Sequence, residues 1–222
     1  MIPAFLSAYG YYGFLSVGAA SMFVLTMRRR NRYGLSVPSA LCFPLLLLIC
    51  GISGAKLLYF VENGFASFSG MSFFGAVYLV LLLMPLIGLL FRLRPLQTLD
   101  ACAPCVASII GFMRFGCFCA GCCGGVYCSV GSFSFRWPTQ LIEGFADMMI
   151  LGLLLSLEQK EENRGLLYPV FLVSYGVMRF LIEFLRDTSK EIAGLSEGQW
   201  LALAGSIIGI VCFLIIRKKG ER

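Results

Sequence analysis

The residues best suited to chemistry in this chain are two arginines that lie within apolar stretches. Arg114 ends an apolar run and is followed by a segment rich in glycine and cysteine, and Arg179 lies inside a second apolar run, residues 165–185. An arginine at the bilayer centre is disfavoured by roughly 2.5–3.5 kcal/mol on insertion scales, so it usually faces a polar cavity or the interface. Guanidinium groups in a low dielectric bind phosphate strongly through paired hydrogen bonds. The pattern therefore predicts a site for an anionic phospholipid head group.

Carboxylates and a phenol accompany these arginines at helical spacing. Tyr175, Arg179 and Glu183 are four residues apart in turn and fall on one face of a helix. A neighbouring stretch has three polar residues at i, i+3 and i+7, namely Gln140, Glu143 and Asp147. Each arginine therefore has a possible internal carboxylate partner, and a structural buried ion pair is the alternative to phosphate binding. We favour phosphate binding, because a polar face shared by two spans is costly in hydrocarbon and usually serves a task.

The cysteines allow three interpretations. Five of them lie within twelve residues: Cys117, Cys119, Cys122, Cys123 and Cys128. If this segment faces an oxidising exterior, one or two disulfides are expected. The C-x-x-C spacing of residues 119–122 also suits a metal or a redox pair, although no second ligand pair and no histidine accompany it. The third interpretation is a set of small, packed thiols. We expect a compact element near Arg114, with a disulfide ahead of a bound metal.

Composition defines the class of protein. Of the 222 residues, 59% are hydrophobic and 14% are charged, so the apolar surface exceeds what one small soluble core can hide. The net charge of +6 follows the membrane topology and does not form a nucleic-acid patch, so no nucleic-acid partner is expected. The chain has no histidine, so its chemistry rests on Arg, Lys, Tyr, Cys, Asp or Glu.

The apolar segments predict an all-α polytopic membrane protein that forms a single domain, residues 1–222. Seven transmembrane helices are expected near residues 3–27, 39–61, 71–91, 96–114, 138–157, 165–185 and 200–216. Twelve of the eighteen Lys and Arg residues fall in the connections and end that this arrangement makes cytoplasmic: Arg28, Arg29, Arg30, Arg32, Arg92, Arg94, Lys160, Arg164, Arg217, Lys218, Lys219 and Arg222. By the positive-inside rule, the N-terminus is outside and the C-terminus is cytoplasmic.

Two further segments each have a structural and a functional interpretation, and the location of a third can be predicted. The small residues Gly51 and Gly54 favour tight helix packing, and Lys56 beside them either snorkels to the outer surface or belongs to the site. The tyrosines of residues 9–13, Tyr12 included, form either an interfacial belt or part of the site wall. Residues 129–137 are expected to be an outer loop that is apolar enough to lie on the membrane.

Taken together, these residues resemble the prolipoprotein diacylglyceryl transferase family of bacterial membrane enzymes over nearly the whole chain. The resemblance rests on the order and spacing of short motifs rather than on one of them. The motifs are residues 12–13, 54–59, 70–73, 100–104, the glycine-rich signature 114–125, 138–143, 175–186 and 194–199.

The resemblance implies transfer of a diacylglyceryl group from phosphatidylglycerol to the thiol of the lipobox cysteine in a prolipoprotein signal peptide, with release of glycerol phosphate. It implies a multi-pass location in the bacterial inner, or cytoplasmic, membrane and no cofactor. Arg114 would contact the lipid phosphate, and Arg179 would be an essential catalytic arginine. The expected catalytic set is Arg179, Arg114, Glu183 and Tyr175, and the expected substrate-binding set is Arg114, Tyr12, Gly125, Gln140, Glu143 and Lys56.

This chain departs from the family pattern at two places. Phe74 stands where the family usually has a histidine, and Cys117, Ala120 and Cys122 stand where it usually has asparagines and a glutamate. The proton of the substrate thiol would then pass to water, a glutamate or a tyrosinate. The alternative functions are a divergent paralogue with another acceptor, or a non-enzymatic membrane protein that binds anionic lipid or uses its thiols in redox sensing.

Overall fold

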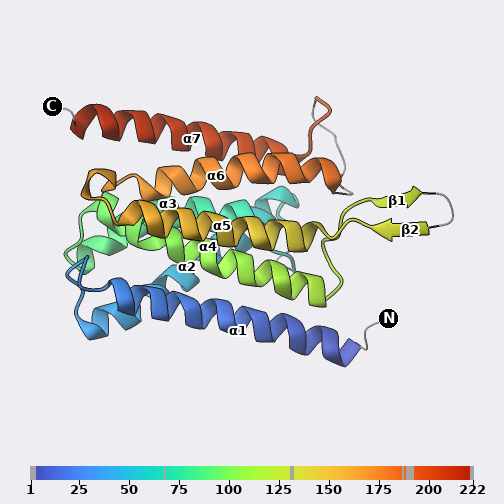
Figure 1. Cartoon of the computed structure of the whole chain (residues 1–222), viewed down its shortest axis with the longest axis horizontal. Coiled ribbons are helices and arrows are strands. Elements are labelled where there is room, and N and C mark those ends of the chain that lie inside the picture. The colour runs from blue at the N-terminus through green and yellow to red at the C-terminus, as the bar shows by residue number, and fades with distance from the viewer. Residues whose placement is uncertain (1–3, 68, 131–132, 187, 189–192, 221–222) are drawn as a thin grey trace.

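The structure is a computed structural model that describes residues 4–67, 69–130, 133–186, 188 and 193–220. Within these residues, seven α-helices run along the same long axis (Figure 1). Their bounds are α1 Ala4–Arg29, α2 Val37–Glu62, α3 Phe73–Leu90, α4 Pro95–Cys119, α5 Thr139–Glu158, α6 Leu167–Ile182 and α7 Glu197–Gly220. Two 3-10 turns, η1 Glu161–Asn163 and η2 Glu183–Leu185, precede and follow α6. The predicted all-α membrane architecture is confirmed.

Six of the helices in the described residues are long and apolar enough to cross a membrane: α1, α2, α4, α5, α6 with η2, and α7. The remaining helix, α3, is apolar but shorter. Helix α4 is the centre of the bundle. In its apolar, membrane-crossing stretch 67% of the residues are buried, whereas in that of α1 only 17% are buried. It packs against α1, α3, α5 and α6. Its small side chains, alanine, cysteine and glycine, allow this close approach on several sides.

Helices α2 and α3 cross at two glycines. A Cβ atom at Gly54 would lie 2.3 Å from the carbonyl oxygen of Gly75, and one at Gly75 would lie 2.2 Å from the carbonyl oxygen of Gly54. The absence of both side chains is what lets the backbones touch. The prediction that Gly54 serves tight helix packing is confirmed.

The segment between α4 and α5 differs from the sequence prediction. The sequence predicts an outer loop over residues 129–137, but strands β1 Tyr127–Val130 and β2 Phe133–Arg136 form an antiparallel hairpin. The hairpin projects beyond the end of the bundle (Figure 1). Helix α4 also continues five residues past Arg114 to Cys119, where the prediction had the chain leaving the span. Phenylalanine and serine alternate in this segment, a period-2 pattern typical of a strand.

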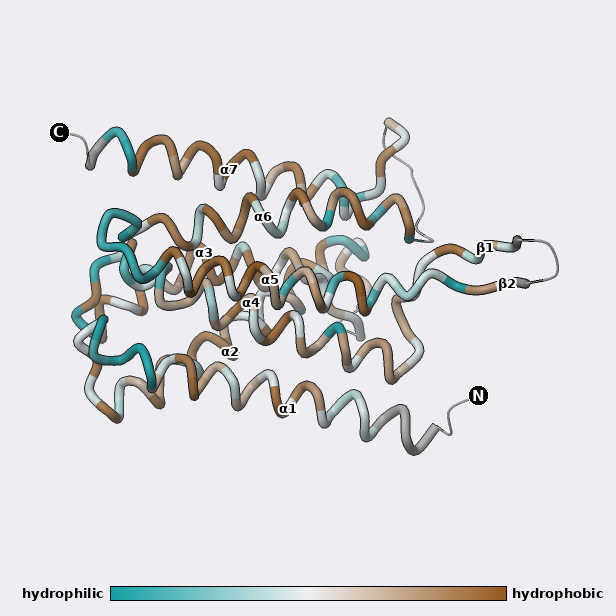
Figure 2. Tube along the Cα trace, viewed as in Figure 1, coloured by the Kyte–Doolittle hydropathy of each residue, from teal (hydrophilic) through white to brown (hydrophobic). Residues whose placement is uncertain are grey.

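The two ends of the bundle carry different connecting segments. The hydrophilic connections α1–α2 and α5–α6 lie at one end, and the hairpin lies at the other (Figure 2). Within the helices, hydrophilic positions also occur in the hairpin-side halves of α4, α5 and α6 (Figure 2). The described ends of α1 and α7 lie at opposite ends of the bundle (Figure 1).

Candidate functional site

The candidate site is built around Glu143, a fully buried carboxylate in the first half of α5. Its Oε1 atom lies 2.7 Å from Nη1 of Arg179 and accepts a hydrogen bond of 3.0 Å from Nη1 of Arg186. Its Oε2 atom lies 2.5 Å from Nε of Arg114. One carboxylate from α5 therefore holds arginines from α4, from α6 and from the residue that follows η2.

Glu183 is the second carboxylate of this network. Its Oε2 atom lies 2.8 Å from Nη2 of Arg179 and 3.6 Å from Nε of Arg186, and its Oε1 atom accepts a hydrogen bond of 3.1 Å from Ser196. Arg179 is in α6 and Glu183, four residues later, is the first residue of η2, so the two side chains point the same way. Arg179 thus donates one terminal nitrogen to each glutamate, which fixes the plane of its guanidinium group.

The five side chains form what we call the arginine network: Arg114, Arg179, Arg186, Glu143 and Glu183. All five are mostly buried, with Arg186 the most exposed at 13% of its side chain. Three guanidinium groups and two carboxylates leave one net positive charge among the ion-paired groups. Nε of Arg114 faces Oε2 of Glu143 but makes no hydrogen bond within the described part of the chain. The network therefore has both a surplus charge and a donor for an added anion.

Aromatic side chains close the inner side of the network. Tyr175 lies one helical turn before Arg179 and is 3% exposed. Its ring stacks on Phe171 with centroids 5.7 Å apart and meets Phe74 edge to face at 6.5 Å. Phe74, at the position where the resembled family has a histidine, thus lies against a predicted catalytic residue. Asp147, one turn beyond Glu143, is also buried, and its oxygens have no hydrogen-bond partner in the described residues.

Gln140 and Gly125 belong to the rim of the site and not to the arginine network. Nε2 of Gln140 donates a hydrogen bond of 2.5 Å to the carbonyl oxygen of Cys122. Gly125 pairs with Arg186 in an isolated β-bridge, and its N–H donates to the carbonyl oxygen of Trp137 at 2.9 Å. A Cβ atom at Gly125 would lie 2.3 Å from the carbonyl oxygen of Leu185, so the bridge requires glycine. Both residues hold the segment between α4 and α5 against the arginines.

Two predicted substrate-binding residues lie on other surfaces of the bundle. Tyr12 is on α1, 65% exposed, with its ring edge to face against Tyr11. Lys56 is half-buried on α2, a helix that packs on α3 and α1. The ion pairs of the arginine network join residues of α4, α5, α6 and η2 and include neither Tyr12 nor Lys56.

The cysteine-rich segment contains a cluster of three thiols rather than a disulfide. All ten cysteines are free, so the structure does not contain the predicted disulfide. The sulfur atoms of Cys117, Cys122 and Cys123 lie within 4.8 Å of one another, and we call these three residues the thiol trio. The other two predicted members are outside it, because Cys119 faces Gly10 of α1 and Cys128 lies in β1.

The two trio members beyond the end of α4 are electrostatically different. A hydrogen bond from the Cys117 thiol, together with the positive charges of Arg114 and Arg186, lowers the pKa of Cys123 to about 5. Partial burial and the neighbouring charge of Cys123 raise the pKa of Cys122. Cys123 is therefore the thiolate of the trio near neutral pH.

Comparison with known proteins identifies the fold that carries this network. A model of the family "Prolipoprotein diacylglyceryl transferase" matches residues 4–215. The chain belongs to the prolipoprotein diacylglyceryl transferase family. A Clostridium tetani protein named phosphatidylglycerol–prolipoprotein diacylglyceryl transferase is 30% identical, over 96% of this chain and 94% of its own length. A Clostridium perfringens protein with the same name and the suffix 2 is 27% identical over 98% and 94%. One from Idiomarina loihiensis is 32% identical over 73% and 67%.

Within this member of the diacylglyceryl transferase family, Arg186 is the network residue that sequence reasoning left out. The sequence predicts a span over residues 165–185 that ends just before Arg186, whereas the structure brings Nη1 of Arg186 to 3.0 Å from Oε1 of Glu143. The 3-10 turn η2 follows Ile182, and after it Arg186 pairs with Gly125 in the β-bridge. Its spacing of three residues from Glu183 was the available signal.

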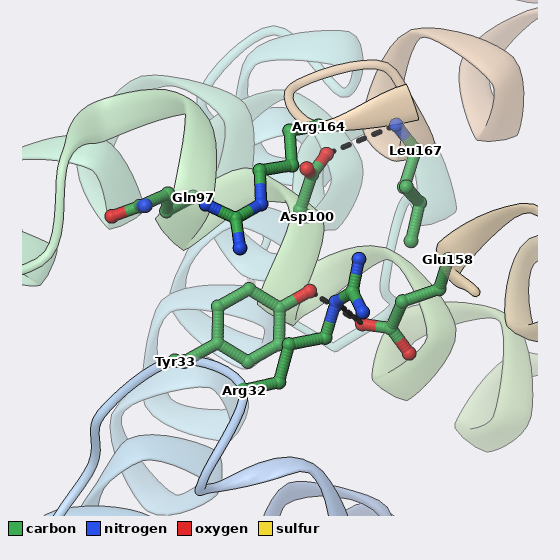
Figure 3. A pocket seen from close by; sticks show the side chains of 7 residues that line it. All are labelled: Arg32, Tyr33, Gln97, Asp100, Glu158, Arg164 and Leu167. Carbon is green, nitrogen blue, oxygen red and sulfur yellow. Dashed lines mark hydrogen bonds and ion pairs between the residues drawn. The ribbon is translucent and has the colours of Figure 1, made fainter. Parts of the chain in front are cut away.

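A second polar cluster of this transferase-family chain lies near the α1–α2 and α5–α6 connections (Figure 3). Glu158 pairs with Arg29 at 2.6 Å and accepts a hydrogen bond of 2.5 Å from Tyr33. Burial raises the pKa of Tyr33, so its phenol stays protonated and donates. Asp100 accepts hydrogen bonds from the backbone N–H groups of Gly165, at 2.5 Å, and Leu167, at 3.0 Å. These contacts satisfy the N-terminus of α6 and join α1, α4, α5 and α6, which indicates a structural role.

Proposed function

We propose that this chain transfers a diacylglyceryl group from phosphatidylglycerol to the cysteine thiol of a prolipoprotein lipobox. The relatives named above carry both substrates in their names. In the reaction, the thiol sulfur forms a bond to the glyceryl carbon, and the bond from that carbon to the phosphate oxygen breaks. Glycerol phosphate leaves with the electron pair, and the thiol proton passes to a base. No oxidant, reductant or cofactor is needed for this balance.

The observation that carries the proposal is the arginine network. Three guanidinium groups are held by two carboxylates at fixed positions in a buried region, and the ion-paired groups keep one net positive charge. A surplus buried positive charge is costly without an anion. A phosphodiester entering from the bilayer supplies one negative charge and acceptor oxygens, so it neutralises the surplus.

The same groups favour the transition state more than the bound lipid. As the carbon–oxygen bond breaks, the phosphate gains negative charge, and preorganised donors in a low dielectric stabilise that gain without reorganising. Arg114, whose buried Nε makes no hydrogen bond in the described residues, is the direct phosphate ligand in this proposal. Arg179 is the second catalytic arginine, because Glu143 and Glu183 fix its plane.

The remaining residues have positioning roles in the proposal. Glu143 and Glu183 orient the arginines, and Tyr175 closes the inner wall beside Arg179. Gln140 and Gly125 hold the segment between α4 and α5 in place at the rim. Tyr12 and Lys56, which lie on α1 and α2, contact the substrates only outside the network. The proton acceptor is a group other than imidazole, because the chain contains no histidine.

We further propose that all of residues 1–222 act as one domain with seven spans, an outer N-terminus and a cytoplasmic C-terminus, in the inner membrane of a bacterium. Helix α3 has 18 residues, which at about 1.5 Å each give about 27 Å, close to the roughly 30 Å of bilayer hydrocarbon. The described ends of α1 and α7 lie at opposite ends of the bundle, as an odd number of spans requires (Figure 1).

Two experiments test these proposals separately. For topology, a reporter fused after Lys218 is expected to be active only in a cytoplasmic reporter system, and an external reporter signal would contradict the arrangement. For activity, purified protein in vesicles of labelled phosphatidylglycerol is mixed with a lipobox peptide. Label is expected on the peptide, and a peptide with serine in place of the lipobox cysteine should remain unlabelled. Equal labelling of both peptides would refute thiol transfer.

A further inference from the structure

The thiol trio is positioned by the way in which α4 ends. Gly121 has a φ of +68°, a left-handed conformation that glycine adopts without steric cost. Its N–H donates to the carbonyl oxygen of Phe118 at 3.1 Å, and the N–H of Cys122 donates to that of Cys117 at 3.2 Å. These two bonds are those of a Schellman motif, in which the second residue after the helix cap folds back over the third-last helical residue. Cys122 and Cys117 are those two residues.

The backbone that carries Cys122 and Cys123 is also held from α5. The carbonyl oxygen of Cys122 accepts the hydrogen bond from Gln140, and that of Cys123 accepts one of 3.1 Å from Thr139. Both donors are buried residues in the first turn of α5. The two exposed thiols therefore sit on a fixed turn above the buried thiol of Cys117, and their convergence is built into the fold.

Three converging thiols match a set of metal ligands better than a disulfide, which uses only two of them. Catalytic zinc sites commonly have three protein ligands and a fourth position that is open to water or another ligand. Tetrahedral zinc with bonds of about 2.3 Å to sulfur places the sulfurs about 3.8 Å apart. The sulfur atoms of the trio lie within 4.8 Å of one another, which is close to that spacing.

Charge favours the same conclusion. Zinc binds thiolates, and the trio lies beside two cationic side chains: Arg114 is three residues before Cys117 on α4, and Arg186 forms the β-bridge with Gly125. Three thiolates and one divalent cation carry one net negative charge. That negative charge would be attracted to the nearby guanidinium groups at the end of α4.

We propose that Cys117, Cys122 and Cys123 form a three-thiolate Zn²⁺ site at the C-terminal end of α4, with a fourth position open to an external ligand. This site goes beyond the proposed transfer reaction and does not depend on it. Gln140 and Thr139 support it from behind the ligands, as groups outside a metal's first ligand shell commonly do.

Metal binding by the full chain in detergent, under reducing conditions, tests the site. Equilibrium dialysis against Zn²⁺ followed by elemental analysis is expected to give one zinc per chain. Co²⁺ in place of zinc is expected to give a thiolate-to-cobalt charge-transfer band. Replacing any one ligand, as Cys117→Ser, Cys122→Ser or Cys123→Ser, is expected to weaken zinc binding at least about a hundredfold, because each thiolate carries a large share of the affinity.

The chain offers matched controls in the same segment. Cys119→Ser and Cys128→Ser each remove a cysteine that lies outside the trio, and both variants should keep the zinc stoichiometry and the cobalt band. Since Cys122 and Cys123 are exposed, their serine variants are expected to fold even if Cys117→Ser does not. Zinc binding that survives both exposed-cysteine variants would overturn the proposal, as would a disulfide within the trio in protein alkylated directly in cells.

Discussion

Glu143 and Arg179 form an ion pair of 2.7 Å between two helices, and both side chains are almost completely buried. The pair joins α5 to α6, and the same carboxylate also holds Arg114 of α4. These buried charges therefore affect the stability of the bundle. Removing one partner leaves the other unpaired in a low dielectric, so each member of the network can be tested by single substitutions.

Substitution of Arg179 tests whether the shape of the guanidinium group matters in addition to its charge. Arg179→Lys keeps the positive charge but cannot reach Glu143 and Glu183 with two nitrogens at once. We expect the transfer rate to fall about a hundredfold or more, since a charge-assisted donor to the developing charge is lost. Arg164→Lys, at an exposed pair with Glu161 at the other end of the bundle, is the matched control. Equal rates for the two variants would remove Arg179 from the mechanism.

Substitution of Glu143 tests its role in stability. Glu143→Gln keeps the size of the side chain but leaves Arg114 without an ion-pair partner in the described residues, and Arg179 and Arg186 with Glu183 alone. We expect the free energy of unfolding to fall by about 3–5 kcal/mol, the cost of breaking a buried ion pair from one side. Denaturant unfolding in detergent measures it. Glu162→Gln, which removes an exposed pair of 3.9 Å with Lys160, should change stability by less than about 0.5 kcal/mol.

The crossing of α2 and α3 gives a prediction about packing. Gly54→Ala places a methyl group 2.3 Å from the backbone of Gly75, so the helices must separate. We expect a loss of about 1–3 kcal/mol in unfolding free energy. Gly152→Ala is the control on α5, where no atom lies within 4 Å, and it should stabilise the chain by up to about 1 kcal/mol. Two variants of equal stability would show that the crossing is not close packed.

The pKa of Cys123 predicts a distinct pH dependence of alkylation in metal-free protein. A thiol whose pKa is lowered to about 5 is already thiolate above about pH 6. Its alkylation rate should therefore be flat between about pH 6 and pH 8 and should fall as the pH drops through 5. Cys122, whose pKa is raised, should react faster with every increase over the same range. Peptide mapping after timed alkylation measures both, and a Cys123 rate that climbs steadily from pH 6 to pH 8 would contradict the assignment.

The sequence predicted the helices well because apolar stretches that end in basic clusters have few other solutions in a membrane. It also placed Arg179 and Glu183 on one face, since their spacing alone decides that. It did not predict that one carboxylate, Glu143, holds three arginines, because this depends on how α4, α5 and α6 are rotated against one another. Only tertiary packing fixes that rotation.

The segment after Arg114 shows the other limit of sequence reasoning. The C-x-x-C spacing suggests that Cys119 and Cys122 act together, whereas in the structure Cys122 lies next to Cys117 and Cys123. The available signal was Gly121, which follows the helix end and permits the backbone to fold back. The predicted outer loop is a hairpin for a similar local reason, because phenylalanine and serine alternate there with the period of a strand.

The most direct test of the account is the rate at which glycerol phosphate is released from phosphatidylglycerol vesicles in the presence of a lipobox peptide. Mass spectrometry follows the released glycerol phosphate and the modified peptide together. With the unchanged chain we predict release in equal amount to peptide modification, and a loss of about a hundredfold or more for both Arg114→Ala and Arg179→Ala. No release by the unchanged chain, together with undiminished lipid binding by Arg179→Ala, would contradict the account.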